Sequence, residues 1–373
     1  MYILAILLFS SLAFLNVFNK EIVDKYKVIF AFVCFIFLIF HDGLRWETGT
    51  DWLPYTQAYE DMANGIEYVN YTNQFESGYL MLFALSYFIS DEYTVYLIIH
   101  AVIFYTLFFI CIFKLSKYPF VSILVFYMVT LPYLGMNRQF IAMSIYAIGL
   151  IYLAKGQRYY YLLFIAIAFF FHHSVAIAAT AVFFNKKIRN RYLLIVLGIA
   201  LAISFSGIIK TLSTGLALVL NGSMEDKADA YTNMTNDLSI VSIIFSLIRK
   251  LLWISLLMIF DKKVDDKDDS YYTFFNMYFL GSIFYVLFNG TPLQIIVSRA
   301  LIYFNIMEMF LIPYVLTIFK PNYGKLLIMF VLVAYCYINI KKGFDNFAIE
   351  GKFDLFEPYK GLFINTDYVR QTH

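Results

Sequence analysis

Four arginines of this sequence lie in or beside apolar segments: Arg45, Arg138, Arg249 and Arg299. An arginine at the centre of a membrane helix costs about 2.5–3.5 kcal/mol on insertion scales, so it usually faces a partner or a cavity. Because arginine grips phosphate and carboxylate groups through two parallel hydrogen bonds, the four could form a cationic pocket suited to a lipid diphosphate. More ordinary interpretations are a solvated pair between Arg45 and Asp51, an interfacial anchor at Arg138, or a helix break around Arg249.

A histidine pair, His172–His173, ends another apolar run. Adjacent residues of a helix point about 100° apart, so the two imidazoles cannot both face one cavity. The ordinary interpretation of each is a packed, hydrogen-bonded histidine. A metal site would need further ligands, and neither H-x-x-x-H nor C-x-x-C accompanies the pair, so we expect no metal and no other cofactor.

The elements that hold these residues are expected to be membrane helices. The 373 residues are 61% hydrophobic and only 14% charged, with a mean hydropathy of +0.71, whereas soluble domains carry about 25% charged residues. A net charge of +2 without a basic tract gives no indication of nucleic-acid binding. We therefore predict an all-α polytopic membrane protein, with one transmembrane domain over residues 1–340 and a polar and aromatic tail over 341–373.

About 11–13 transmembrane helices are expected, since each needs roughly 20 apolar residues, or fewer where neighbours compensate. The clear candidates are 2–18, 28–40, 93–113, 119–135, 139–154, 159–171, 174–184, 192–209, 238–260, 271–289, 294–318 and 324–340. Lysine and arginine favour cytoplasmic loops, so loops poor in both are predicted to face outward. These outer loops are 41–75, 136–138, 172–173, 210–237 and 289–293.

The segment 77–90 disturbs this alternation. A single span, 93–113, is enough to connect the outer loop 41–75 with the cytoplasmic Lys114 and Lys117. We interpret 77–90 as a re-entrant or interfacial helix on the outer side, where irregular backbone survives against protein or a wet cavity. An ordinary short span is the alternative.

Three groups of residues resemble, in their order along the chain, motifs of the EpsG-like family of bacterial polysaccharide polymerases. This family is related to the Wzy-type O-antigen and capsule polymerases. The resemblance extends over about residues 40–310 and rests on the runs Arg45-x-x-x-Gly49-Thr50-Asp51-x-x-x-Tyr55 with Phe75-Glu76-x-Gly78-Tyr79, Asn137-Arg138-Gln139-x-Ile141-Ala142 with Phe171-His172-x-Ser174, and Arg299 followed by Tyr303-Phe304.

The resemblance implies a glycosyltransferase of exopolysaccharide, capsule or O-antigen biosynthesis in the bacterial cytoplasmic (inner) membrane, crossing it many times. The donor would be a growing glycan on undecaprenyl diphosphate, and the acceptor a lipid-linked oligosaccharide repeat unit. The acceptor hydroxyl would attack the anomeric carbon at the outer face. A flippase and a chain-length regulator of the same pathway would be further partners.

The same resemblance assigns roles to the arginines. A departing diphosphate needs cations, which Arg138, Arg249 and Arg299 could supply without a metal. Arg45 and Gln139 would be further contacts to the diphosphate.

It also calls for a base that takes the proton of the attacking hydroxyl. His172 is the natural candidate, because the ordinary pKa of histidine lies near the working pH. Asp51 or Glu76 could serve instead.

Two other functional classes are consistent with a protein of this composition. A lipid-linked oligosaccharide flippase or transporter usually has a two-half symmetry, which is not evident in this sequence. An integral-membrane O-acyltransferase needs an acyl-donor site on the cytoplasmic side, whereas the polar residues here gather in the outer loops. The length of the glycan product would separate both classes from a polymerase.

Overall fold

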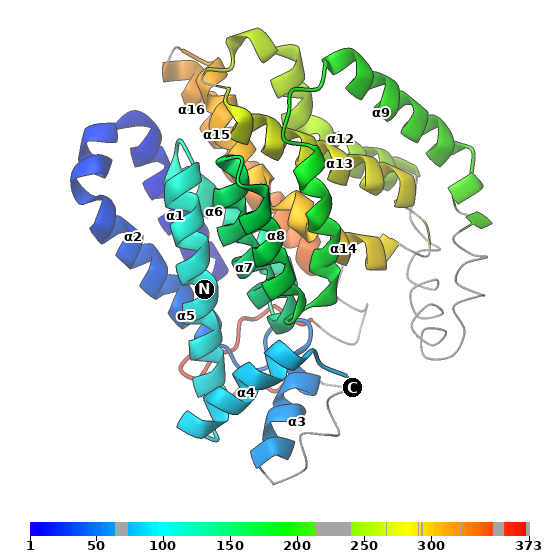
Figure 1. Ribbon diagram of the computed structural model, residues 1–373. Helices are drawn as coiled ribbons and strands as arrows, with labels where there is room; N and C mark the ends of the chain where they lie inside the picture. The colour runs from blue at the N-terminus through cyan, green and yellow to red at the C-terminus, as the bar shows by residue number, and fades with distance from the viewer. Residues whose placement is uncertain are drawn as a thin grey trace. The chain divides into compact units, whose positions relative to one another are not determined.

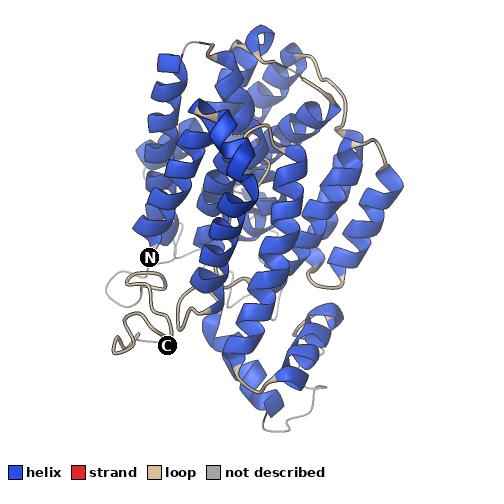
Figure 2. Cartoon of the chain, turned by 90° about the vertical axis from the view of Figure 1, so that its left-hand side faces the viewer, coloured by secondary structure: helices blue, strands red, loops and turns tan. Residues whose placement is uncertain are grey.

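The computed structural model describes residues 1–63, 74–209, 211–212, 240–265, 267–289, 291, 294–320, 322–345 and 354–370. The chain is 79% helical, with 14 helices and no strand among the described residues. Figure 2 shows this part as helices joined by loops. The prediction of an all-α polytopic membrane protein is confirmed.

Four helices of the described part are long and apolar enough to cross a membrane. They are Tyr93–Leu115, Asp269–Phe288, Arg299–Ile318 and Asn322–Asp345. Several shorter apolar helices accompany them, from Tyr2–Phe18 to Asn190–Phe205. The total of about 11–13 spans stays a prediction.

The chain divides into two compact units, of which unit 1 comprises residues 1–179 and 319–373, and unit 2 residues 180–318. Unit 1 contains the helices α1 (Tyr2–Phe18), α2 (Lys20–Gly43), α3 (Trp52–Ala63), α4 (Ser77–Ile89), α5 (Tyr93–Leu115), α6 (Pro119–Thr130), α7 (Asn137–Ala154), α8 (Arg158–Phe169) and α16 (Asn322–Asp345). Side by side lie α7 and α8, α5 and α7, α2 and α5, and α1 and α6, while α16 packs on α1 and α6.

One end of unit 1 gathers the loops that are predicted to face outward, and we call it the outer end. There the backbone N–H of Thr50 donates to the carbonyl of Leu134 (2.8 Å), and that of Gly78 to the carbonyl of Phe170 (2.9 Å). These bonds join the segment 41–75, the turn before α7 and the end of α8. Sequence-distant loops therefore meet as the lysine pattern predicts, while their exposure to the outside stays a prediction.

Helix α4 begins and ends at this outer end. Gly78 lies in its first turn, against Phe170, and a Cβ at Gly78 would stand 2.8 Å from the Phe170 carbonyl oxygen. At the other end of α4, the Tyr59 hydroxyl of α3 donates to the carbonyl of Ser90 (2.8 Å). Figure 1 shows α3 and α4 together beside the start of α5. This course supports the interpretation of 77–90 as a re-entrant or interfacial helix.

The end of the chain returns to the same place. Helix α16 extends to Asp345, so the first residues of the predicted tail are helical. Residues 354–370, which we call the C-terminal segment, pack on residues 44–50: the N–H of Leu362 donates to the carbonyl of Leu44 (3.0 Å), and the N–H of Trp46 to the carbonyl of Lys360 (3.0 Å). The sequence did not indicate this contact.

Unit 2 is built around α13 (Asp269–Phe288). Its other helices are α9 (Asn190–Phe205), α12 (Ile240–Ile259), α14 (Gln294–Asn305) and α15 (Glu308–Ile318), all of which pack on α13. The predicted span 294–318 is thus divided at residues 306–307. Most of the predicted outer loop 210–237 lies outside the described residues.

The segment 174–184, predicted as a span, is not a regular α-helix. This stretch is a 3-10 helix of 11 residues, His173–Phe183. At a rise of about 2.0 Å per residue it would extend about 22 Å, short of a hydrocarbon core of about 30 Å.

The course of unit 1 predicts that residue 60 and residue 363 face the same side of the membrane. Glu60 and Phe363 are exposed, and the three native cysteines are buried. An impermeant maleimide added to intact cells should therefore label Glu60→Cys and Phe363→Cys and leave the wild type unlabelled. Lys155→Cys, on a lysine-bearing connection, should react only after the membrane is opened. Labelling of only one of the first two variants in intact cells would contradict this arrangement.

Candidate functional site

Glu76 lies at the centre of a charged cluster at the outer end. Its Oε2 accepts a hydrogen bond from Nη1 of Arg138 at 2.9 Å, and its Oε1 lies 3.0 Å from Nδ1 of His172. The backbone N–H of His173 also donates to Oε1, at 3.4 Å. Three of the residues predicted from the sequence, which span 96 positions of the chain from Glu76 to His172, therefore form one site in unit 1.

Three elements bring these side chains together. Glu76 directly precedes α4, whose start is fixed against the end of α8 through Gly78. His172 follows α8, and Arg138 lies in the first turn of α7. The start of a helix carries unpaired N–H groups and a partial positive charge, so this position of Arg138 favours an anion.

Arg138 is held on several sides. Its Nε donates to the Tyr55 hydroxyl at 3.0 Å, its Nη1 also donates to the carbonyl of Gln74 at 2.9 Å, and its guanidinium carbon lies 4.9 Å from the centre of the Phe75 ring. Its side chain nevertheless keeps a quarter of its surface exposed. Nη2 makes no hydrogen bond within the described part of the chain, and so remains for a ligand.

Tyr55 is a site residue that we did not assign a role from the sequence. It lies on α3, four residues after Asp51 and hence one helical turn away, which is the signal that could have indicated it. Burial, opposed by the charge of Arg138 and assisted by that of Asp51, raises the pKa of Tyr55 to about 12. The phenol is therefore protonated at neutral pH and acts as a hydrogen-bonding partner. Asp51 itself lies in the turn that leads into α3, and its role as a base stays a prediction.

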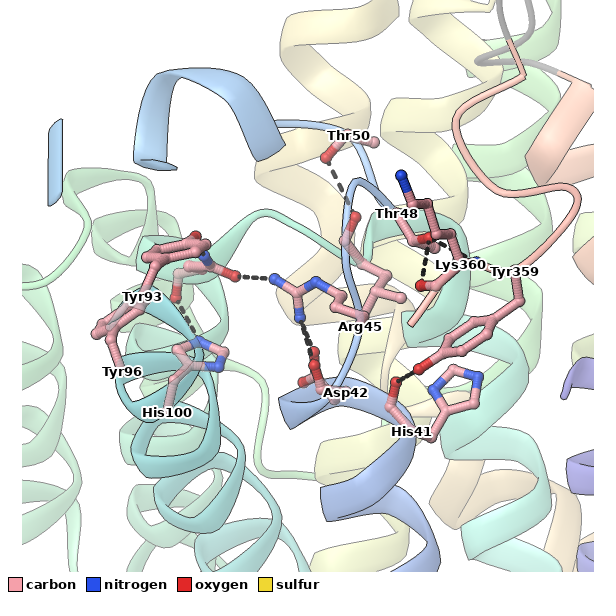
Figure 3. Close-up of polar contacts among 12 residues, drawn as sticks. His41, Asp42, Arg45, Thr48, Thr50, Tyr93, Tyr96, His100, Tyr359 and Lys360 are labelled. Carbon is pink, nitrogen blue, oxygen red and sulfur yellow. Dashed lines mark hydrogen bonds and ion pairs between the residues drawn. The ribbon is translucent and has the colours of Figure 1, made fainter. Parts of the chain in front are cut away.

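The structure gives Arg45 a different position from the predicted one. The residue is 1% exposed, its Nη1 pairs with Asp42, and its Nη2 donates to Oδ1 of Asn137 at 2.8 Å. Figure 3 shows this guanidinium between Asp42 on one side and the α5 residues Tyr93 and His100 on the other. Arg45 therefore neither pairs with Asp51 nor offers a surface to a diphosphate; instead it holds the residue that precedes Arg138.

Asn137 is bound from two further directions. Its Nδ2 donates to the Tyr93 hydroxyl at 3.2 Å, and its carbonyl lies 3.0 Å from Nε2 of His100. Both partners lie on α5 and are buried. The first turn of α7 is thus fixed to α2 and α5. Next to it, Gln139 donates from Nε2 to the hydroxyl of Ser174 at 3.4 Å, on the same side as His172.

Arg249 and Arg299 belong to unit 2, on α12 and α14. Helix α12 is continuous through residue 249, so the alternative of a helix break there is not observed. Next to Arg249 lies the half-buried Lys250, whose Nζ donates to Oδ1 of Asn305 and lies 4.3 Å from the centre of the Tyr278 ring. A pocket that unites Arg249 and Arg299 with Arg138 stays a prediction.

The charge state of Glu76 decides what the cluster can do. Burial alone would raise its pKa, but the hydrogen bond from His172 and the charge of Arg138 outweigh burial and lower the pKa from 4.5 to about 2. An ionised carboxylate only accepts hydrogen bonds, so Nδ1 of His172 must carry the proton. Nε2 of His172 is then left as a proton acceptor, whereas Glu76 is a weak base.

This shift predicts how stability depends on pH. Because the pKa of Glu76 is lower in the folded protein, its ion pair contributes stability above pH 4.5, and this contribution is lost as the pH falls from there towards about 2. The difference in Tm between the wild type and Glu76→Gln should be constant at neutral and mildly acidic pH and should shrink below pH 4.5. Thermal unfolding of both proteins in detergent from pH 7 to pH 2.5 measures it. A difference that vanished by pH 6 would contradict the ionised Glu76.

The fold and the cluster together define an all-α membrane protein with a partly exposed arginine, a carboxylate and an oriented histidine at one end of a helical unit. Comparison with known sequences assigns it further: a sequence model of the EpsG family matches residues 28–359. The chain belongs to the EpsG family, which is associated with polysaccharide biosynthesis. No curated protein and no solved structure matches it.

Proposed function

We propose that this protein is a polysaccharide polymerase of the bacterial cytoplasmic membrane. It transfers a growing glycan from undecaprenyl diphosphate to a lipid-linked oligosaccharide repeat unit at the outer membrane face. The observation that carries the proposal is the Arg138–Glu76–His172 cluster, because it sets an anion-binding guanidinium beside an oriented proton acceptor. Membership of the EpsG family supports the same class of reaction.

Each group has a defined part in the transfer. The hydroxyl of the acceptor sugar attacks the anomeric carbon of the donor glycan, and its proton passes to Nε2 of His172. The bond between the anomeric carbon and the diphosphate oxygen breaks, and its electron pair leaves with undecaprenyl diphosphate. Nη2 of Arg138 binds the diphosphate and stabilises the charge that develops on its oxygen.

Glu76 serves both of the other residues. Its carboxylate keeps the Nδ1 proton of His172 in place, which orients Nε2, and stabilises the imidazolium that forms when Nε2 accepts the proton. It also holds Arg138, which limits the motion of the guanidinium before the diphosphate arrives. Because its own pKa is about 2, Glu76 orients and does not act as the base.

Reconstitution tests the proposal. The purified protein in liposomes receives undecaprenyl-diphosphate-linked repeat units, and the glycans are separated by length. A polymerase produces a ladder of multiples of the repeat unit and releases undecaprenyl diphosphate in equal amount. Units that move across the bilayer without growing in length would indicate a flippase, and a mass gain of one acyl group an O-acyltransferase; either result would overturn the proposal. Adding the flippase and chain-length regulator of the pathway would then show whether they act on this protein.

A further inference from the structure

The C-terminal segment, residues 354–370, binds the backbone of residues 44–50 along its length. The hydroxyl of Thr48 donates to the carbonyl of Lys360 at 3.0 Å and accepts from the N–H of Lys360 at 3.1 Å. The N–H of Gly49 donates to the carbonyl of Leu355 at 2.9 Å, and the Tyr359 hydroxyl donates to the carbonyl of His41 at 2.7 Å. Figure 3 shows Lys360 and Tyr359 against this loop.

The same loop also packs on the turn before α7. Gly49 has a φ of +112°, and a Cβ there would stand 2.4 Å from the carbonyl oxygen of Leu134. Thr50 donates from its backbone N–H to the same oxygen at 2.8 Å. The turn that ends in Asn137 and Arg138 therefore rests directly on the loop that the C-terminal segment holds.

Two side chains that support the site depend on this loop, one within it and one on the helix that follows it. Arg45 binds Oδ1 of Asn137, the residue before Arg138. A few residues further on, α3 begins at Trp52 and carries Tyr55, which accepts the hydrogen bond from Nε of Arg138. A displacement of residues 44–50 would move both supports of Arg138 together.

A partly buried ion pair fixes the loop to the C-terminal segment. Nζ of Lys360 lies 2.8 Å from Oε2 of Glu47, and the two side chains are 10% and 27% exposed. Glu47 has a φ of +46°, in the left-handed region that residues other than glycine seldom adopt. Such a conformation persists only where its surroundings hold it, and Lys360 is the partner that does so.

We propose that the C-terminal segment is a working part of the polymerase site, and that Lys360 is a positioning residue that acts through Glu47 and residues 44–50 on Arg138. This inference rests on the proposed function. It assigns a catalytic contribution to a segment more than 200 residues away from Arg138 in the sequence, and it requires that the segment and the site lie on the same side of the membrane.

A charge exchange in the full chain tests the inference. Lys360→Glu and Glu47→Lys should each lower the kcat of glycan elongation roughly 10- to 100-fold, because a small misplacement of a catalytic group has effects of this size. The double variant, in which the two charges are exchanged, should recover most of the rate, and Lys360→Arg should recover part of it. Lys262→Glu, an exposed charge reversal in unit 2, is the matched control and should leave the rate unchanged.

A second measurement does not depend on activity. Hydrogen exchange of the Gly49 and Thr50 amides reports their bonds to Leu355 and Leu134. Their exchange should accelerate at least 10-fold in Lys360→Glu and return to the wild-type rate in the exchanged pair. Full activity in both single variants, or an exchanged pair as slow as they are, would overturn the inference. If the amides respond as expected and Arg138→Ala remains fully active, the proposed function fails while the structural coupling stands.

Discussion

Replacing Arg138 by alanine is expected to abolish polymer while the protein still inserts. Arg138 is the one residue of the cluster with a guanidinium nitrogen left for a ligand, and it lies at the positive end of α7. Loss of a donor to developing charge costs roughly 10²–10³-fold in rate. Lysine at the same position should recover only part of the rate, since its ammonium cannot bind a phosphate with two parallel hydrogen bonds or reach Tyr55 and Glu76 at once.

The measurement is the rate of glycan elongation per molecule of purified enzyme, with Tm determined for each variant. Loss of Arg138 also leaves Glu76 without its ion pair, so a loss of folded protein must be separated from a loss of catalysis. Arg158→Ala, an exposed arginine at the opposite end of unit 1, is the matched control and should be fully active. Normal elongation by Arg138→Ala would remove the cationic site from the mechanism.

Replacing His172 by alanine is expected to reduce elongation by about 10²–10⁴-fold, the usual effect of losing a general base. Binding of undecaprenyl diphosphate should persist, because Arg138 and its partner Glu76 remain. His172→Gln separates the two roles of the ring: it can keep a hydrogen bond to Glu76 but cannot accept the proton. It should therefore keep the Tm of the wild type and share the low rate of the alanine variant.

His173 provides a control within the same turn. The His173 side chain is 66% exposed, and its Nδ1 lies 3.9 Å from Oε1 of Glu76. The His172 side chain is 26% exposed, and its Nδ1 lies 3.0 Å from the same oxygen. His173→Ala should remain largely active. If both histidines serve only in packing, both alanine variants will lower the amount of folded protein while the rate per folded molecule stays level. In that case the base must be sought at Asp51.

Composition predicted the class of protein, and residue spacing supplied the members of the central cluster as candidates, although not their pairing. Glu76, Arg138 and His172 could be selected because each interrupts or ends an apolar run, a position where a charged or titratable side chain needs a reason. Their convergence follows from the predicted topology, since helices that alternate between two sides bring all their outer loops to one end. The interpretation of α4 as a re-entrant or interfacial helix rests on one apolar segment too many between two loops, and its place in the membrane stays a prediction.

Residues whose partners lie far away in the sequence were not predicted correctly. In the sequence, Arg45 is an arginine in a polar loop and therefore looks like a ligand-binding residue. In the structure it is buried against Asn137, 92 positions later. In the sequence, nothing distinguishes Lys360 from the other basic residues of a polar tail. Its contact with Thr48, 312 positions earlier, is visible only in the structure. Periodicity and insertion costs are properties of single segments, and neither contains information on such pairings.

The Tyr2 hydroxyl donates to the carbonyl of Phe356, so the first helix and the C-terminal segment meet at the outer end. During synthesis the chain emerges from its N-terminus, and residues 354–370 follow the fourteen helices of the described part of the chain. The support of Arg138 by Lys360 can therefore form only after α16 has entered the bilayer and its end has crossed to the outer side. A nascent chain still attached to the ribosome already contains Arg138, Glu76 and His172 but lacks the contact of Lys360 with residues 44–50. With the proposed function, completion of membrane insertion becomes the step that matures the polymerase, and a chain arrested before α16 has inserted is expected to be inactive.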